Sequence, residues 1–117
     1  AKTDLIMTAH VAAPAVTGNR EPSTVSHRIL TEKLRGELGY EGVIITDALC
    51  MGAITDAYAS GDACVACLKA GVDLLCMPYD YVQAFERVME AVERGEIPEA
   101  RIDASVARIL SMKGQEA

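Results

Sequence analysis

Two side chains that could do chemistry stand directly after apolar runs of the sequence. Asp47 follows the run 43–46, and His10 follows the run 5–9. Parallel α/β folds place reactive groups just past the carboxyl ends of their strands. A carboxylate in that position can be tuned in its ionisation by apolar walls and neighbouring loops. The spacing therefore makes Asp47 the first candidate for a functional group.

Position alone leaves alternatives open for each candidate. Asp47 could instead cap the helix that follows it, because aspartate is common at helix N-caps. His10 could be a ligand contact, an orienting group or a filled polar niche. His27 falls in the first turn of an expected helix and is given no role. Asp73 lies near the start of its run, where barrel side chains serve stability, so it is expected to be structural.

The elements that must position these residues alternate along the chain. Apolar runs at 5–9, 43–46 and 72–77 are separated by stretches with helical periodicity. This alternation predicts βαβ units around a parallel sheet. Ser26 is expected to cap the first long helix and Gly39 to end it. Further helices are expected at 51–70 in two pieces broken near Ser60, at 81–93, and from Pro98 onward.

The segment 11–25 contains Pro14, Gly18 and Pro22 and is long for a plain connection. It follows the carboxyl end of the first run, where parallel folds keep functional loops. We expect it to be a functional loop or a sign of missing neighbours.

Composition excludes several classes of protein. The 117 residues fit one domain, 1–117, with 50% apolar and 24% charged residues. A net charge of −6 without a basic stripe argues against nucleic acid as a partner. No apolar run is long enough to span a membrane. Two histidines and the absence of phosphate-loop and zinc motifs lead us to expect no metal and no cofactor.

The four cysteines favour packing over chemistry. Cys64 and Cys67 form a C-x-x-C, a spacing also found in redox and zinc sites. Their surroundings have the pattern of a helix interior, where cysteine packs as a small hydrophobe. Cys50 and Cys76 are not at ligand spacing. Free thiols fit a reducing compartment, so a cytoplasmic location is expected, with export as the alternative.

Several motifs together resemble family 3 glycoside hydrolases, and within them the β-N-acetylhexosaminidase branch. The longest is 34–54, Leu-Arg-Gly-Glu-Leu-Gly-Tyr-Glu-Gly-Val-Ile-Ile-Thr-Asp-Ala-Leu-Cys-Met-Gly-Ala-Ile. The others are Met-Thr-Ala-His-Val at 7–11, Pro-Ser-Thr-Val-Ser at 22–26, the segment 70–78 and the segment 103–110. The resemblance covers nearly the whole chain.

The resemblance implies a TIM-type (β/α)₈ barrel, of which this chain would be the C-terminal portion, about strands 6–8. Residues 1–117 would form one partial catalytic barrel of the family's N-terminal type. Asp47 corresponds to the retaining nucleophile, which forms a covalent glycosyl-enzyme. His10 and Met51 match positions that line the sugar pocket. The acid/base of this branch lies on a loop upstream, so the isolated chain is expected to be inactive.

The implied substrate is a terminal β-linked N-acetylhexosamine, and the implied role is peptidoglycan recycling. A partial barrel has uncovered edges, so we expect self-association or pairing with the missing half-barrel. The alternative is a non-catalytic βα fragment that acts only in assembly. A receiver-like domain is disfavoured, because it needs an acidic pair after its first strand and a lysine after a later one.

Overall fold

The computed structural model describes residues 3–114, which contain two parallel strands in one sheet. Strands β1 (Leu5–Thr8) and β2 (Val43–Thr46) pair in register, with Thr8 opposite Thr46. The helices between them are α1 (Pro14–Thr17), the 3₁₀ helix η1 (Ser23–Val25) and η2 (Arg28–Glu37). Those that follow are α2 (Gly52–Thr55), α3 (Ser60–Ala70), α4 (Tyr81–Glu93) and α5 (Glu99–Met112). This order confirms the predicted α/β class.

The run 72–77 differs from the expected third strand. It lies parallel to β2 but forms only an isolated bridge, between Ile45 and Leu74. Side chains take the place of backbone partners on either side of this bridge. The carboxylate of Asp73 accepts the N–H of Ile44 at 2.9 Å, and the hydroxyl of Thr46 accepts the N–H of Cys76 at 2.9 Å. These bonds satisfy the backbone without a continuous ladder.

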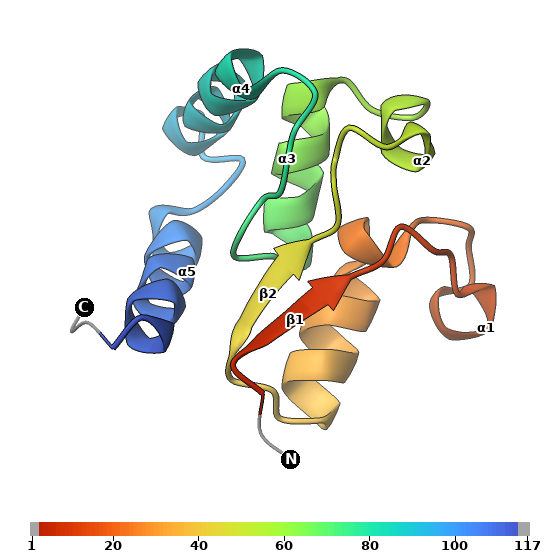
Figure 1. Cartoon of the computed structure of the whole chain (residues 1–117), viewed down its shortest axis with the longest axis vertical. Coiled ribbons are helices and arrows are strands. Elements are labelled where there is room, and N and C mark those ends of the chain that lie inside the picture. The colour runs from red at the N-terminus through yellow and green to blue at the C-terminus, as the bar shows by residue number, and fades with distance from the viewer. Residues whose placement is uncertain (1–2, 115–117) are drawn as a thin grey trace.

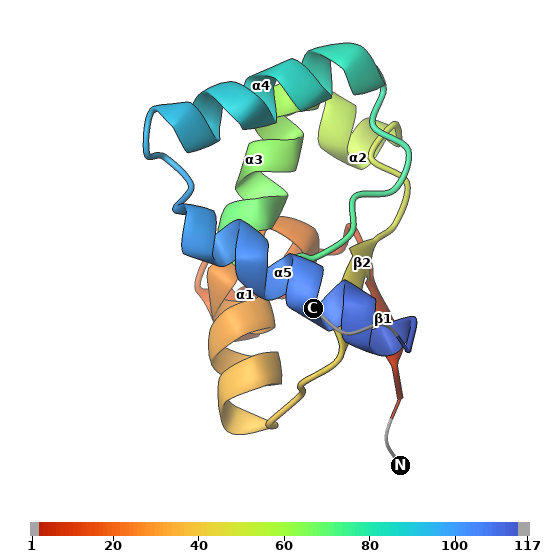
Figure 2. The same cartoon turned by 90° about the vertical axis from the view of Figure 1, so that its left-hand side faces the viewer.

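Helices η2 and α3 lie on one side of the two strands, and α5 lies beside them (Figures 1 and 2). Strand β2 is central: Val43 and Ile44 are fully buried, and Ile44 joins the core formed with η2 and α3. Strand β1 is more open, since Leu5 is 43% and Met7 58% exposed. The sheet therefore has a covered face and an uncovered one.

Helix η2 begins and ends as expected but is wound differently. The hydroxyl of Ser26 accepts the N–H of Ile29 at 3.2 Å, and Gly39 takes a left-handed φ of 69°. The N–H of Tyr40 then donates to Leu34 at 3.0 Å, which closes the helix end. Its turns are those of a π-helix, wider than an α-helix. Its apolar side chains Ile29, Leu30 and Leu34 pack in or against the core, whereas Leu38, just after the helix, is 77% exposed.

The later helices follow the predicted pattern with one difference. The stretch 51–70 is broken at 56–59, slightly before the expected break, and Gly71 ends α3. Helix α4 has the predicted bounds and is capped by Asp80, whose carboxylate accepts the N–H of Gln83 at 3.1 Å. Its apolar side chains are only partly covered, because α4 meets α3 through small side chains such as Ala84. Phe85 is 68% exposed.

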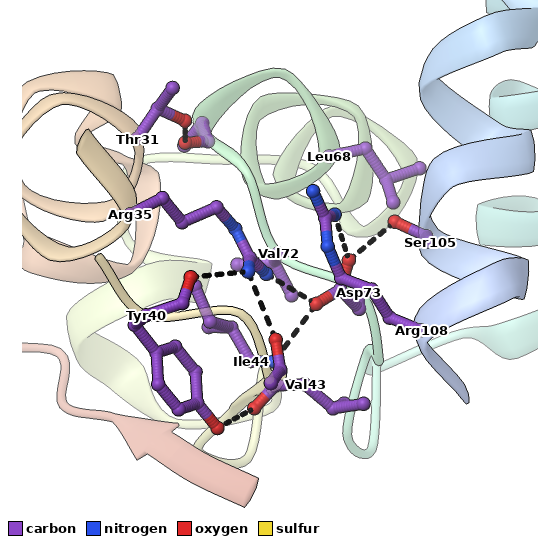
Figure 3. A network of polar contacts seen from close by, with 12 residues as sticks. Thr31, Arg35, Tyr40, Val43, Ile44, Leu68, Val72, Asp73, Ser105 and Arg108 are labelled. Carbon is purple, nitrogen blue, oxygen red and sulfur yellow. Dashed lines mark hydrogen bonds and ion pairs between the residues drawn. The ribbon is translucent and has the colours of Figure 1, made fainter. Parts of the chain in front are cut away.

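Asp73 ties the helices to the sheet, as Figure 3 shows. Its side chain is fully buried and accepts hydrogen bonds from Arg35 of η2 at 2.6 Å and from Ser105 of α5 at 2.6 Å. Arg108 of α5 donates to the same carboxylate at 3.0 Å, and Arg101 lies 3.9 Å from it. Burial lowers the pKa of Arg35 and of Arg101, although the negative charge of Asp73 acts to raise both. The predicted structural role of Asp73 is confirmed.

A candidate active site at the carboxyl ends of the strands

Asp47 continues β2 by one residue at the edge of the sheet. Its N–H donates to the carbonyl of Thr8 at 3.2 Å, which fixes its backbone against β1. Its side chain is half-buried, and Oδ1 accepts the N–H of Ala48 at 2.8 Å. The next helix, α2, has Met51 at its N-cap, so Asp47 is not the cap of that helix. The capping alternative is thereby excluded.

His10 comes to the same edge from β1. The parallel register places Thr8 opposite Thr46, so two residues later His10 is level with Ala48. Its Nε2 lies 2.8 Å from the carbonyl oxygen of Ala48, and its Nδ1 lies 2.9 Å from the hydroxyl of Thr24. A carbonyl can only accept, so Nε2 carries a hydrogen and donates. Both ring nitrogens are therefore engaged within the chain.

Thr24 is the residue that sequence reasoning missed. It is fully buried, and its hydroxyl lies 3.1 Å from that of Thr8 and 3.1 Å from the carbonyl of Ala9. The only signal in the sequence was its place in the Pro-Ser-Thr motif at 22–24. The segment 11–25 is folded on itself, with a bridge between Ala12 and Pro22, and so carries Thr24 to the end of β1.

Met51 completes the group. Its N–H donates to the carbonyl of Ala48 at 3.3 Å, and it is 44% exposed. Ala48 thus links all three candidates: its N–H bonds Asp47, and its carbonyl bonds His10 and Met51. The structure brings the three predicted site residues together around one residue that the sequence did not single out.

Other candidate positions lie away from this group. His27 is exposed at the start of η2. Cys64 and Cys67 are buried in the core between helices, which confirms the packing interpretation, and burial raises the pKa of Cys67 to about 12. A hollow of about 860 Å³ lies near the opposite ends of the strands, and its lining includes none of the three site residues.

Within residues 3–114, no group of three or more acidic, histidine or cysteine side chains could hold a metal ion. Over the same residues, no helix combines the length and apolarity needed to cross a membrane.

Fold and site together define a class: parallel α/β proteins that carry polar side chains just past the carboxyl ends of their strands. Residues 1–112 match the family described as glycosyl hydrolase family 3 N terminal domain. The chain belongs to this family, as the sequence motifs predicted.

Individual proteins and solved structures are also similar to the chain. The chain is 35% identical to Beta-hexosaminidase A of Pseudoalteromonas piscicida, over 93% of this chain and 21% of that protein. It is 33% identical to Beta-hexosaminidase LpqI of Mycobacterium tuberculosis, over 93% of this chain and 30% of that protein. Among solved structures, a family 3 β-N-acetylglucosaminidase from Paenibacillus sp. str. FPU-7 matches with a TM-score of 0.89 and 44% identity, over 95% of this chain and 22% of that one. The chain thus spans less than a third of the length of these relatives.

Proposed function

We propose that this chain carries the nucleophile of a retaining β-N-acetylhexosaminidase, and that the nucleophile is Asp47. The observation that supports it most is the hydrogen bonding of the two oxygens of the Asp47 carboxylate. Oδ1 is held by the N–H of Ala48 at 2.8 Å, while no other described residue bonds Oδ2. Asp47 is only half-buried at the edge of the sheet, which is consistent with contact to a substrate there.

The chemistry follows from that geometry. Oδ2 attacks the anomeric carbon of the sugar, the bond to the leaving-group oxygen breaks, and a glycosyl ester of Asp47 forms. Water then cleaves the ester and restores the carboxylate. The bond from Ala48 fixes Oδ1, which leaves Oδ2 as the attacking oxygen. The acid/base that serves both steps comes, in this proposal, from outside these 117 residues.

The substrate class rests on the relatives. The names of those quoted above point to β-linked N-acetylhexosamine, and we extend that class to this chain. Met51, 44% exposed beside the site, would offer its flexible thioether to the apolar surface of the sugar. His10, which the sequence motifs assign to the sugar pocket, has both ring nitrogens engaged by Ala48 and Thr24, so a role other than contact with the sugar must also be tested.

We further propose that the two strands and the run 72–77 correspond to about strands 6–8 of an eight-stranded barrel. A barrel of that kind needs roughly 200–250 residues, which supports the expectation that the isolated chain is inactive.

The test joins this chain to the rest of the Paenibacillus sp. enzyme, in place of the matching segment. A dinitrophenyl N-acetyl-β-glucosaminide is the substrate, because its leaving group needs no acid assistance. We expect Asp47→Asn to lower dinitrophenolate release by about a thousandfold or more, as loss of a nucleophile does elsewhere. Intact mass should show a glycosyl adduct only with Asp47 present. Asp103→Asn, at an exposed position of α5, is the matched control. Unchanged release by Asp47→Asn would show that the assignment is wrong.

A second candidate, assembly without catalysis, is favoured by the uncovered face of β1. Leu5 and Met7 are 43% and 58% exposed there, and Phe85 of α4 is 68% exposed. Exposed apolar side chains beside a strand edge favour association with another chain. Light scattering across a range of concentrations should show at least a dimer of the isolated chain. A monomer at every concentration would contradict self-association.

A further inference from the structure

We propose that His10 is a positioning residue, which fixes the turn after β2 and through it the carboxylate of Asp47. The proposal rests on the proposed role of Asp47 and adds a function for the imidazole that does not involve contact with the sugar.

Ala48 links His10 to Asp47. Nε2 of His10 holds the carbonyl of Ala48 at 2.8 Å, and the N–H of Ala48 holds Oδ1 of Asp47 at 2.8 Å. The N–H and the carbonyl of Ala48 flank one Cα. A bond that fixes the carbonyl therefore restricts the rotation that would carry the N–H away from Asp47.

The ring of His10 is also anchored on its other side. Nδ1 of His10 lies 2.9 Å from the hydroxyl of Thr24, a side chain with no exposed surface. The ring is thus held at both nitrogens: at Nδ1 by Thr24, in the segment that follows β1, and at Nε2 by Ala48, in the turn after β2. Neither nitrogen is left to bond a sugar hydroxyl while these contacts persist.

The bond from Nε2 of His10 to Ala48 forms with the ring in either protonation state. In the neutral ring Nε2 donates to Ala48, and the hydroxyl of Thr24 donates to Nδ1. In the charged ring both nitrogens donate, and the hydroxyl of Thr24 turns to the carbonyl of Ala9, which lies 3.1 Å away. Nε2 carries a hydrogen in both states. The grip on Ala48 therefore does not depend on the charge of His10.

Three variants distinguish a role of His10 in positioning the turn from a role in contacting the sugar. His10→Gln keeps an amide donor near the place of Nε2, whereas His10→Leu keeps the bulk and removes the donor. Thr24→Val keeps the shape of the anchor and removes its hydroxyl. If His10 positions the turn after β2, His10→Gln should resemble the native protein, and the turn should become more mobile in the other two variants.

Nuclear magnetic resonance of the whole chain reads the turn directly. The Ala48 amide proton should exchange faster with water and shift in His10→Leu and Thr24→Val, while His10→Gln leaves it near its native position. An Ala48 amide unchanged in His10→Leu would overturn the proposal. This readout needs no activity, so it stands even if Asp47 proves not to be the nucleophile.

Kinetics of the joined protein described above give the second readout. We expect His10→Leu to lower kcat by about tenfold or more with little change in KM, because small misplacements of a reacting group are costly. His10→Gln should recover most of the loss. A raised KM with unchanged kcat would instead identify His10 as a sugar contact and overturn the proposal. A fully active Asp47→Asn protein would refute the nucleophile and leave the Ala48 resonance as the test of the contact.

Discussion

The hydroxyl of Ser105 donates a 2.6 Å hydrogen bond to Oδ1 of Asp73, and so joins α5 to the segment beside β2. The other oxygen of Asp73 accepts Arg35 of η2 at 2.6 Å and the N–H of Ile44 at 2.9 Å. One buried carboxylate thus connects two helices and a strand. It also offsets the positive charge of the arginines that surround it.

Replacing Asp73 by alanine should therefore be strongly destabilising. The change leaves Arg35 and Arg108 without their acceptor in a poorly solvated setting, and removing one partner of a buried pair costs about 3–5 kcal/mol. Urea unfolding followed by circular dichroism measures the loss. Asp103→Ala, on the exposed side of α5, should stay within about 0.5 kcal/mol of the native chain. Equal stabilities of the two variants would contradict the role given to Asp73.

Gly61 allows α3 and α4 to pack closely. A Cβ at this position would overlap the side chain of Arg87 at its Cβ and Cγ, and the neighbouring Gln83 already accepts the N–H of Gly61 at 2.7 Å. We expect Gly61→Ala to cost about 1–3 kcal/mol, the usual cost of overpacking. Gly52→Ala is the control, because a Cβ there meets only ordinary contact at 3.7 Å from Asp56. Thermal unfolding should separate the two variants, and a Gly61→Ala melting temperature at or above that of Gly52→Ala would refute the packing argument.

The buried thiols predict how stability depends on alkaline pH. Burial raises the pKa of Cys67 from 9.0 to about 12 and that of Cys64 to about 11. A raised pKa in the folded state means that folding favours the protonated thiol. This stabilisation is complete below pH 9.0, the unfolded pKa, and is lost as the pH rises towards about 12.

The free energy of unfolding should therefore fall above pH 9.0. Cys67→Ala should show a shallower fall than the native chain, because one of the two titrating thiols is gone. Urea unfolding at several alkaline pH values gives the slopes. Cys50→Ala, which changes an exposed thiol, should keep the native slope. Identical slopes for all three proteins would show that the buried thiols do not control this pH range.

Local pattern was sufficient to predict β2 and α4, and the position of Asp47 followed from them. A short apolar run fixes a buried strand, and the residue after it must lie at the edge of the sheet. The bond between His10 and Thr24 could not be predicted in this way. It joins residues 14 positions apart and depends on how the intervening segment folds back.

The spacing of apolar residues predicted burial less well where a side chain must be covered by other parts of the fold. Leu38 and Phe85 stand at positions that periodicity assigns to an inner face, yet they are 77% and 68% exposed. The pattern identifies a surface that can be buried, and these residues do not meet enough of this chain to cover it. The run 72–77 failed as a strand for another reason: the side chains of Asp73 and Thr46 bond the backbone in place of a ladder.

The contacts of Asp73 also bear on how the chain folds. They reach back 38 positions to Arg35 and forward 32 to Ser105, so each must close a long loop before it contributes. Neither the segment that ends with β2 nor the segment that begins with α4 contains the carboxylate that both need. We therefore expect the two halves to gain and lose their structure in one cooperative step, with neither half persisting as an independent folding unit.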